Sequence, residues 1–172
     1  VDSMPNPTIN SVSSLCTTDS PVTLTADLSG GTWSGTGVVN TNEFDPSVAG
    51  IGSFTVTYTV NNGACTATDQ ITITVSDQYD ATIDAVSDLC ENDSPVVLTA
   101  TDAGGTWSGT GVVNTDEFDP NLAGPGDHVI TYTISGNCGD TDTETIHVDS
   151  MPNPTINSVS SLCTTDSPVT LT

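Results

Sequence analysis

The sequence lacks basic side chains altogether. Its 172 residues include no Lys and no Arg, against 22 Asp and Glu, and the formal net charge at pH 7 is −22. Binding to DNA, RNA or an anionic membrane surface relies on basic side chains that neutralise phosphates, so none of these is expected as a partner. Nucleotide and phosphoryl chemistry is disfavoured for the same reason, because Lys and Arg usually hold the phosphates.

Long apolar runs are also missing. No stretch of about 18 apolar residues is present, so no membrane insertion is expected. Residues 1–5 lack the basic and apolar regions of a signal peptide. With no Lys or Arg, a side-chain salt bridge can involve only a His or a chain terminus. We therefore expect stability to come from apolar burial, backbone hydrogen bonds, disulfides or bound cations.

Internal repeats organise what is present. Residues 1–25 recur letter for letter as 148–172, and residues 30–46 return as 104–120 with one change. We expect one repeat over 1–75, a diverged repeat over 76–148, and the start of a third, a copy of the first, over 149–172. The last 25 residues hold too little material for a core of their own. The pattern predicts a longer array of small domains arranged as beads on a string.

Each repeat has the pattern of an all-β domain. Apolar and Thr residues alternate over residues 54–60 and 71–75, and Asn62-Gly63 between these runs is a hairpin signal. Other short runs are bounded by Gly, Pro, Asn or Asp, and no amphipathic helical stretch of ten residues is found. Six or seven short strands per repeat, by rough count, predict tandem small immunoglobulin-like antiparallel β-sandwiches.

One Trp, one Phe and one Tyr recur in register in the two repeats. We expect these side chains in the core, because large aromatic residues dominate the packing of such sandwiches. The alternative for the two Trp residues is an exposed aromatic platform that binds sugar. The six predicted core aromatics are Trp33, Phe44, Tyr58, Trp107, Phe118 and Tyr132.

Five cysteines predict disulfides and an oxidising, extracytoplasmic location. Pairing within repeats, Cys16 with Cys65 and Cys90 with Cys138, would close two loops of similar size and stabilise each by roughly 4 kcal/mol. Cys163 would then pair outside the chain. The alternative, Cys65 with Cys90 and Cys138 with Cys163, would connect neighbouring repeats across their linkers. No Cys or His spacing suits zinc.

The linker between the first two repeats is acidic. Asp77, Asp80 and Asp84 follow one another there with no basic residue to balance them. Calcium takes six to eight oxygen ligands and often stiffens joints between extracellular domains, so a calcium site at these residues is one hypothesis. The other is a solvated acidic surface. No other cofactor is expected.

The sequence does not indicate an enzyme. Its two histidines, His128 and His147, correspond to Phe54 and Thr74 in the first repeat, so neither belongs to a repeated constellation. No Ser or Cys has a recurring base, and the Gly-Thr-Gly at 35–37 lacks the rest of a dinucleotide fingerprint.

The blocks GGTWSGTGVV, TVTYTV and CTATDQITITV resemble repeats of giant secreted surface proteins of Bacteroidota, the group of the flavobacterial gliding adhesin. The resemblance covers both repeats. It implies export through the type IX secretion system and a role as a long surface filament. It also implies O-glycosylation at Asp-Ser/Thr followed by an apolar residue, which makes Ser3 and Ser150 candidate glycan sites, against ordinary linker serines. The absence of Lys and Arg is not explained by the resemblance.

The sequence thus predicts a structural stalk of an extracellular adhesin or fibre, a disulfide-stabilised mechanical spacer. Its expected partners are neighbouring repeats of the same chain and other copies in a filament. The alternative is a multivalent adhesin in which each repeat weakly binds a ligand such as a glycan. A third hypothesis, lateral or end-to-end assembly of separate chains by strand exchange with the open 25-residue end (148–172), is suggested only by the truncation of the third repeat.

Overall fold

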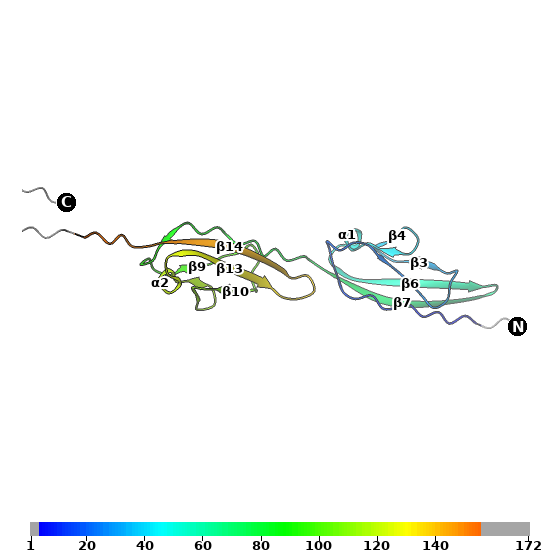
Figure 1. Ribbon diagram of the computed structural model, residues 1–172. Helices are drawn as coiled ribbons and strands as arrows, with labels where there is room; N and C mark the ends of the chain where they lie inside the picture. Colours follow the sequence, from blue (N-terminus) through cyan, green and yellow to red (C-terminus); the bar gives the residue numbers. More distant parts are fainter. Residues whose placement is uncertain (1–3, 156–172) are drawn as a thin grey trace, which may run out of the picture.

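The computed structural model describes residues 4–155 and shows two small β-sandwiches placed end to end (Figure 1). The first contains β1 to β7 and the second β8 to β14. Nearly all regular structure is strand, which confirms the predicted all-β class of tandem sandwiches. No helix within the described residues is long and apolar enough to cross a membrane.

Each sandwich pairs a four-stranded sheet with a three-stranded one. In the first repeat the sheet orders are β1-β7-β6-β3 and β2-β5-β4. The first strand of each large sheet, β1 or β8, is parallel to its neighbour, and every other pairing is antiparallel. The elements of the first repeat are β1 Leu15–Cys16, β2 Val22–Thr23, β3 Thr32–Ser34, β4 Val38–Val39, β5 Glu43–Phe44, α1 Pro46–Ala49, β6 Gly52–Asn62 and β7 Cys65–Ser76.

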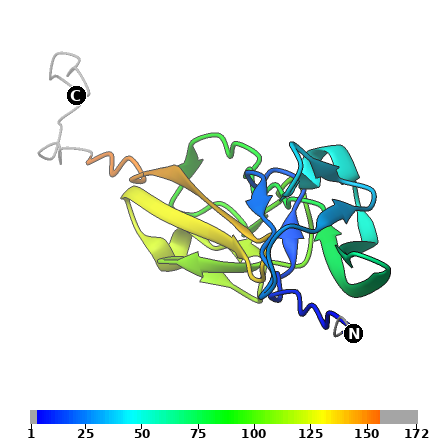
Figure 2. The same ribbon diagram turned by 90° about the vertical axis from the view of Figure 1, so that its right-hand side faces the viewer.

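The second repeat has the same order of elements. Its sheets are β10-β13-β14-β8 and β11-β12-β9. Its elements are β8 Leu89–Cys90, β9 Val96–Val97, β10 Thr106–Gly109, β11 Val112–Val113, β12 Glu117–Phe118, α2 Pro120–Ala123, β13 Gly126–Ile134 and β14 Asp140–Asp149. Figure 2, which looks along the molecule, shows the two repeats one behind the other.

The long hairpin β6–β7 forms where the sequence alternates. Phe54 lies opposite Ile73 and Val56 opposite Ile71, so that apolar side chains of both strands share one face. Val56 and Ile73 are fully buried, while the intervening Thr55 and Thr72 are exposed. Period-two patterning therefore places one face of the hairpin in the core.

Aromatic residues fill both cores at equivalent places. Phe44 and Phe118 are fully buried, and Tyr58 and Tyr132 are nearly so. Trp33 and Trp107 are partly buried against the core clusters, and each ring lies 4.4 Å, centroid to centroid, from the Tyr ring of its own repeat. The Trp side chains therefore pack at the margin of the core.

The Gly-Gly turn before each Trp is required by the nearby Tyr. Gly30 adopts φ +85°, which disfavours other residues, and a Cβ at Gly31 would come within 2.5 Å of the Tyr58 ring. Gly31 N–H donates to Tyr58 Oη at 2.8 Å, and that hydroxyl donates to Leu28 O at 2.7 Å. Gly105 and Tyr132 repeat the N–H to Oη bond at 2.8 Å. The Tyr thus ties a loop to the core of each domain.

Candidate functional site: the junction between the repeats

The two repeats meet at a junction built from three segments. These are the tip of the β13–β14 hairpin (135–139), the end of β1 with the residues beside it (14–18), and the linker (76–79). In Figure 1 the β13–β14 hairpin points toward the first repeat. Because the tip of a second-repeat hairpin contacts the first repeat, the repeats are connected by more than the linker.

A disulfide joins Cys16 of β1 to Cys138 of the hairpin tip. The Cα atoms lie 5.5 Å apart, within the usual range for a disulfide, and 122 residues separate the two cysteines in sequence. Both are buried, with 3% and 5% of their surface exposed. The bond therefore lies inside the junction and connects the two domains covalently.

Hydrogen bonds surround the disulfide. Asn137 Nδ2 donates to Ser14 O at 2.8 Å, from the second repeat to the first. Gln78 Nε2 donates to Gly139 O at 3.2 Å, and Tyr79 N–H donates to Cys138 O at 3.0 Å. A cavity of about 270 Å³ remains between linker and hairpin. The linker is thus fixed to the hairpin rather than free to swing.

The predicted pairing of cysteines within repeats is wrong. Cys16 lies beside Ser76, the last residue of β7, whereas Cys65 is the first residue of that 12-residue strand. At 3.3 Å per residue the strand separates the two cysteines by roughly 35 Å, far more than a disulfide can span. Cys90 and Cys138 are separated in the same way by β14.

Both alternatives across a linker are unsupported as well. Cys138 is bonded to Cys16, and Cys65 and Cys90 are both free, so neither Cys65–Cys90 nor Cys138–Cys163 forms in this structure. Cys163 lies outside the described residues. The sequence signal for the observed bond is that each repeat carries one Cys near its start and one at its hairpin turn, which a parallel first strand places at opposite ends.

The acidic linker residues bind separate partners. Asp77 Oδ1 accepts from Thr17 Oγ1 at 3.3 Å, and Asp84 Oδ2 accepts from Thr99 Oγ1 at 2.7 Å. The Thr82 hydroxyl, 2.6 Å from Asp80 Oδ1, lowers the pKa of Asp80. Within residues 4–155 no three His, Cys, Asp or Glu side chains come close enough together to hold a metal ion. Calcium at Asp77, Asp80 or Asp84 stays a prediction.

Two further carboxylates hold the start of the second repeat on its sheet. Asp140 Oδ2 accepts from Ala81 N–H at 3.0 Å, and Asp142 Oδ2 accepts from Ile83 N–H at 2.9 Å. Ala81 is completely buried and Ile83 nearly so. The acidic stretch of β14 therefore satisfies backbone groups that burial would otherwise leave unpaired.

A second hollow lies beside the aromatic pair of the second repeat. It has a volume of about 350 Å³, and its lining includes Trp107, Tyr132, Asp102 and Asp116. The positions equivalent to the two acids are Leu28 and Asn42 in the first repeat. Of the two described repeats, the second therefore has carboxylates beside the aromatic pair where the first has Leu and Asn.

The remaining predicted residues lie apart from the junction. His128 Nε2 is 2.7 Å from Gly124 O, and His147 forms ion pairs with Asp127 and Asp149. Asp127 accepts a hydrogen bond from His147 and thereby raises the pKa of this exposed His. Ser150 is exposed, whereas Ser3 lies outside the described residues.

Comparison with known proteins gives no family. No family model matches the chain, and no curated protein matches its sequence. Among solved structures, a SusE-like surface-located polysaccharide-binding protein of Bacteroides thetaiotaomicron matches at TM-score 0.35 and 12% identity over 84% of this chain. The chain spans 34% of that protein. Human protocadherin-24 EC1-2 matches at TM-score 0.35 and 13% identity, with 85% of this chain and 99% of that one covered. Similarities this weak assign no function.

Proposed function

We propose that the chain is a repeat region of an extracellular stalk or fibre, in which small β-sandwiches act as a mechanical spacer. The observation that carries the proposal is the junction, where the Cys16–Cys138 disulfide and the Asn137–Ser14 hydrogen bond join one domain to the next, while Gln78 holds the linker against the hairpin. A spacer must keep its two ends far apart, and a chain of domains does so only if successive domains keep a fixed angle to one another. A linker alone would leave relative domain motion as the default.

The position of the disulfide supports a load-bearing role. A bond inside one domain would protect that domain against unfolding, whereas Cys16–Cys138 makes a second covalent connection across the linker. Pulling force between the domains is then shared by the linker and the hairpin β13–β14. Persistent disulfides form in oxidising compartments, which supports an extracytoplasmic location. Surface attachment and type IX export, as the sequence resemblance implies, are part of the same proposal.

Small-angle X-ray scattering tests the spacer. The oxidised chain should give one extended particle, and reduction or the C16S/C138S variant should broaden the distribution of interatomic distances and shorten its mean. C65S/C90S is the matched control, because it removes the two thiols that are free within residues 4–155 and leaves the junction intact. Equal, broad distributions for the oxidised and reduced chains would contradict a stiff joint.

Multivalent glycan binding is the second candidate function. The hollow beside Trp107 favours it, since an aromatic face with nearby carboxylates can stack on and hydrogen-bond a sugar. A glycan array probed with the whole chain and with W107A tests this candidate. A signal that is lost in W107A and kept in W33A would place binding in the second repeat. No signal above background would leave the spacer as the better account.

A further inference from the structure

In the observed junction the Leu15–Cys16 edge of the first repeat receives the tip of the β13–β14 hairpin. The Leu89–Cys90 edge of the second repeat has the same backbone arrangement. Leu89 and Cys90 pair in parallel with Val148 and Asp149, as Leu15 and Cys16 pair with Val75 and Ser76. Glu91 N–H donates to Asp149 O at 3.0 Å, where Thr17 N–H donates to Ser76 O at 2.9 Å in the first repeat. This edge therefore has the backbone arrangement that accepts a hairpin in the observed junction.

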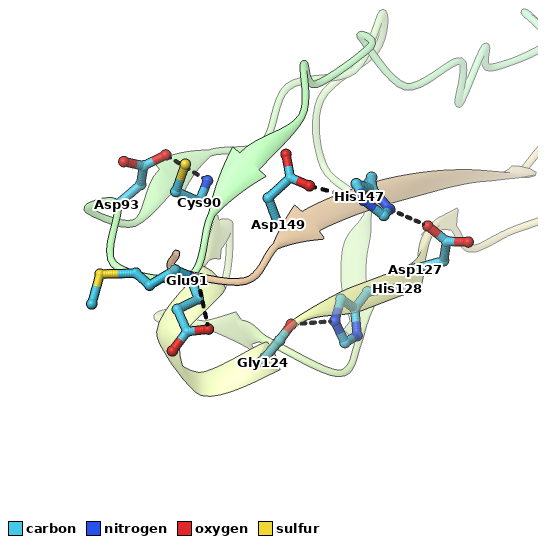
Figure 3. Close-up of polar contacts among 9 residues, drawn as sticks. Cys90, Glu91, Asp93, Gly124, Asp127, His128, His147 and Asp149 are labelled. Carbon is cyan, nitrogen blue, oxygen red and sulfur yellow. Dashed lines mark hydrogen bonds and ion pairs between the residues drawn. The ribbon is translucent and has the colours of Figure 1, made fainter. Parts of the chain in front are cut away.

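The turn after this edge is also the same. Asp93 Oδ2 accepts from Cys90 N–H at 2.8 Å, and Asp19 Oδ2 accepts from Cys16 N–H at 2.7 Å. Figure 3 shows Cys90 and Asp93 beside Asp149 at the end of β14. The orientation of the Cys backbone is thus fixed before any partner arrives.

The exposure of the cysteine is what differs. Cys16 is 3% exposed under the β13–β14 tip, whereas Cys90 is exposed and free. Leu15 and Leu89, the neighbours of these cysteines, are both buried, so the two edges themselves are equally well packed. Cys90 therefore differs from Cys16 in having no hairpin over it within the described residues.

The matching hairpin is at the opposite end of the molecule. The β6–β7 tip carries Cys65 at the position of Cys138, and Cys65 is free. In Figure 1 the tips of both hairpins point the same way, toward the N-terminus. The described region thus has an unfilled receiving edge at one end and an unused hairpin at the other.

The side chains at the two ends match each other in polarity. The observed junction uses Asn137 on the hairpin and Gln78 on the linker. The equivalent residues of the unfilled halves are Ala64 on the β6–β7 hairpin and Met151, which is 51% exposed, after β14. The observed junction thus has a polar residue on the hairpin and another on the linker. The equivalent positions on the β6–β7 hairpin and after β14 are both apolar.

We propose that the Leu89–Cys90 edge receives the β6–β7 hairpin of a further copy of the first repeat and that a Cys90–Cys65 disulfide closes this second type of junction. The further copy is either a later repeat of the same polypeptide or a separate chain. Two thiols join with loss of two protons and two electrons, and an oxidised small-molecule disulfide takes these up to become two thiols. The inference rests on the observed junction and holds for a spacer or a binding array.

Mapping of disulfides tests the proposal on two proteins. One is the 172-residue chain, and the other has residues 1–147 placed twice ahead of 148–172. Both are refolded in a mixture of oxidised and reduced glutathione, free thiols are alkylated, and peptides are cut with a protease specific for acidic residues, since trypsin has no site. We expect a Cys65–Cys90 peptide pair next to Cys16–Cys138.

The two proteins distinguish the sources of the hairpin. A Cys65–Cys90 bond in monomeric doubled chain assigns the hairpin to the same polypeptide. Disulfide-linked ladders of the 172-residue chain assign it to a separate chain. Either result supports the second junction, and C90S must abolish the pair while Cys16–Cys138 still forms.

The proposal is overturned if Cys65 and Cys90 are both fully alkylated in both proteins while Cys16–Cys138 is closed. A bond from Cys65 to Cys163 in place of Cys90 would also overturn it. Because Cys90 is exposed and C90S removes no core side chain, failure of folding is not expected to obscure the result.

Discussion

At the scale of single residues, the tyrosine hydroxyl of each repeat forms hydrogen bonds with two backbone groups of one loop. Tyr58 Oη accepts from Gly31 N–H and donates to Leu28 O, both at the edge of the core. In Y58F these two backbone groups lose their partner, and we expect a loss of about 1–3 kcal/mol in stability of the first repeat. Hydrogen exchange should show faster opening of first-repeat amides only. The second repeat serves as internal control, and Y79F, at an exposed side chain, should change nothing.

His147 gives the stability of the second repeat a pH dependence. Its pKa is raised mainly by the hydrogen bond with Asp127, so the folded state binds the proton more tightly than the unfolded chain. The resulting stability is fully present below the ordinary His pKa of about 6.5 and is lost as the pH rises through the raised pKa. We expect H147Q to lower the urea midpoint at pH 5.5 and to leave it unchanged at pH 9. An NMR titration of D127N should show the His147 pKa moving back down.

Residue identity predicted the core better than it predicted contacts. Phe44 and Phe118 lie in the core because burial of a large aromatic side chain is decided by local alternation and by turn positions. The hollow beside Trp107 could not be predicted, since it depends on how a loop and two strands approach one another. The same holds for the partners of Asp140 and Asp142, which are backbone groups about 60 residues away.

At the scale of elements, alternation located the long hairpins but not their ends. The run at 54–60 lies inside β6, which extends over Gly52–Asn62, because pairing with β7 continues past the last apolar residue. One of the short runs bounded by turn residues, at 8–12, forms only an isolated bridge, between Ile9 and Ala26. The four-residue helices α1 and α2 are too short for any periodic signal, and they begin where Asp45 and Asp119 accept from backbone N–H groups.

The extended segment at the start of each repeat can be tested by giving the second repeat the residues of the first. Ala81 N–H is paired with Asp140 in the second repeat, whereas the equivalent residues of the first are Pro7, which has no N–H, and Ala67. We expect D140A to destabilise the second repeat by about 1–3 kcal/mol, because a buried N–H loses its acceptor.

The double variant A81P/D140A should recover most of that loss, since proline leaves no N–H to satisfy. Urea unfolding of the wild type, the two single variants and the double variant gives four free energies of unfolding, and their differences give the coupling energy. Additive losses would mean that Asp140 acts through something other than the Ala81 N–H. E144Q on the same strand is the control.

At the scale of the whole molecule, the disulfide could not be predicted by treating each repeat as a separate domain. Pairing within a repeat follows if each domain is treated as closed, but the parallel pairing of β1 with β7 places Cys16 and Cys65 at opposite ends of one strand. The partner that lies near Cys16 belongs to the next domain. Which cysteines of neighbouring domains come close together depends on the direction in which the strands run along the array. Composition and spacing in the sequence do not reveal that direction.

The charge of the whole molecule yields the last prediction. With a net charge of −22 and no Lys or Arg, the ion pairs within the described residues are those of His147 alone, so electrostatics is dominated by repulsion among carboxylates. Raising NaCl from 10 to 300 mM shortens the Debye length from about 30 Å to below 8 Å and should raise the urea midpoint. Calcium chloride at the same ionic strength separates screening from binding. An equal effect of both salts would count against a calcium site, whereas an extra stabilisation by calcium that is lost in D77N/D80N would place the ion at the linker. A fall in stability with NaCl would mean that attraction, not repulsion, dominates the folded chain.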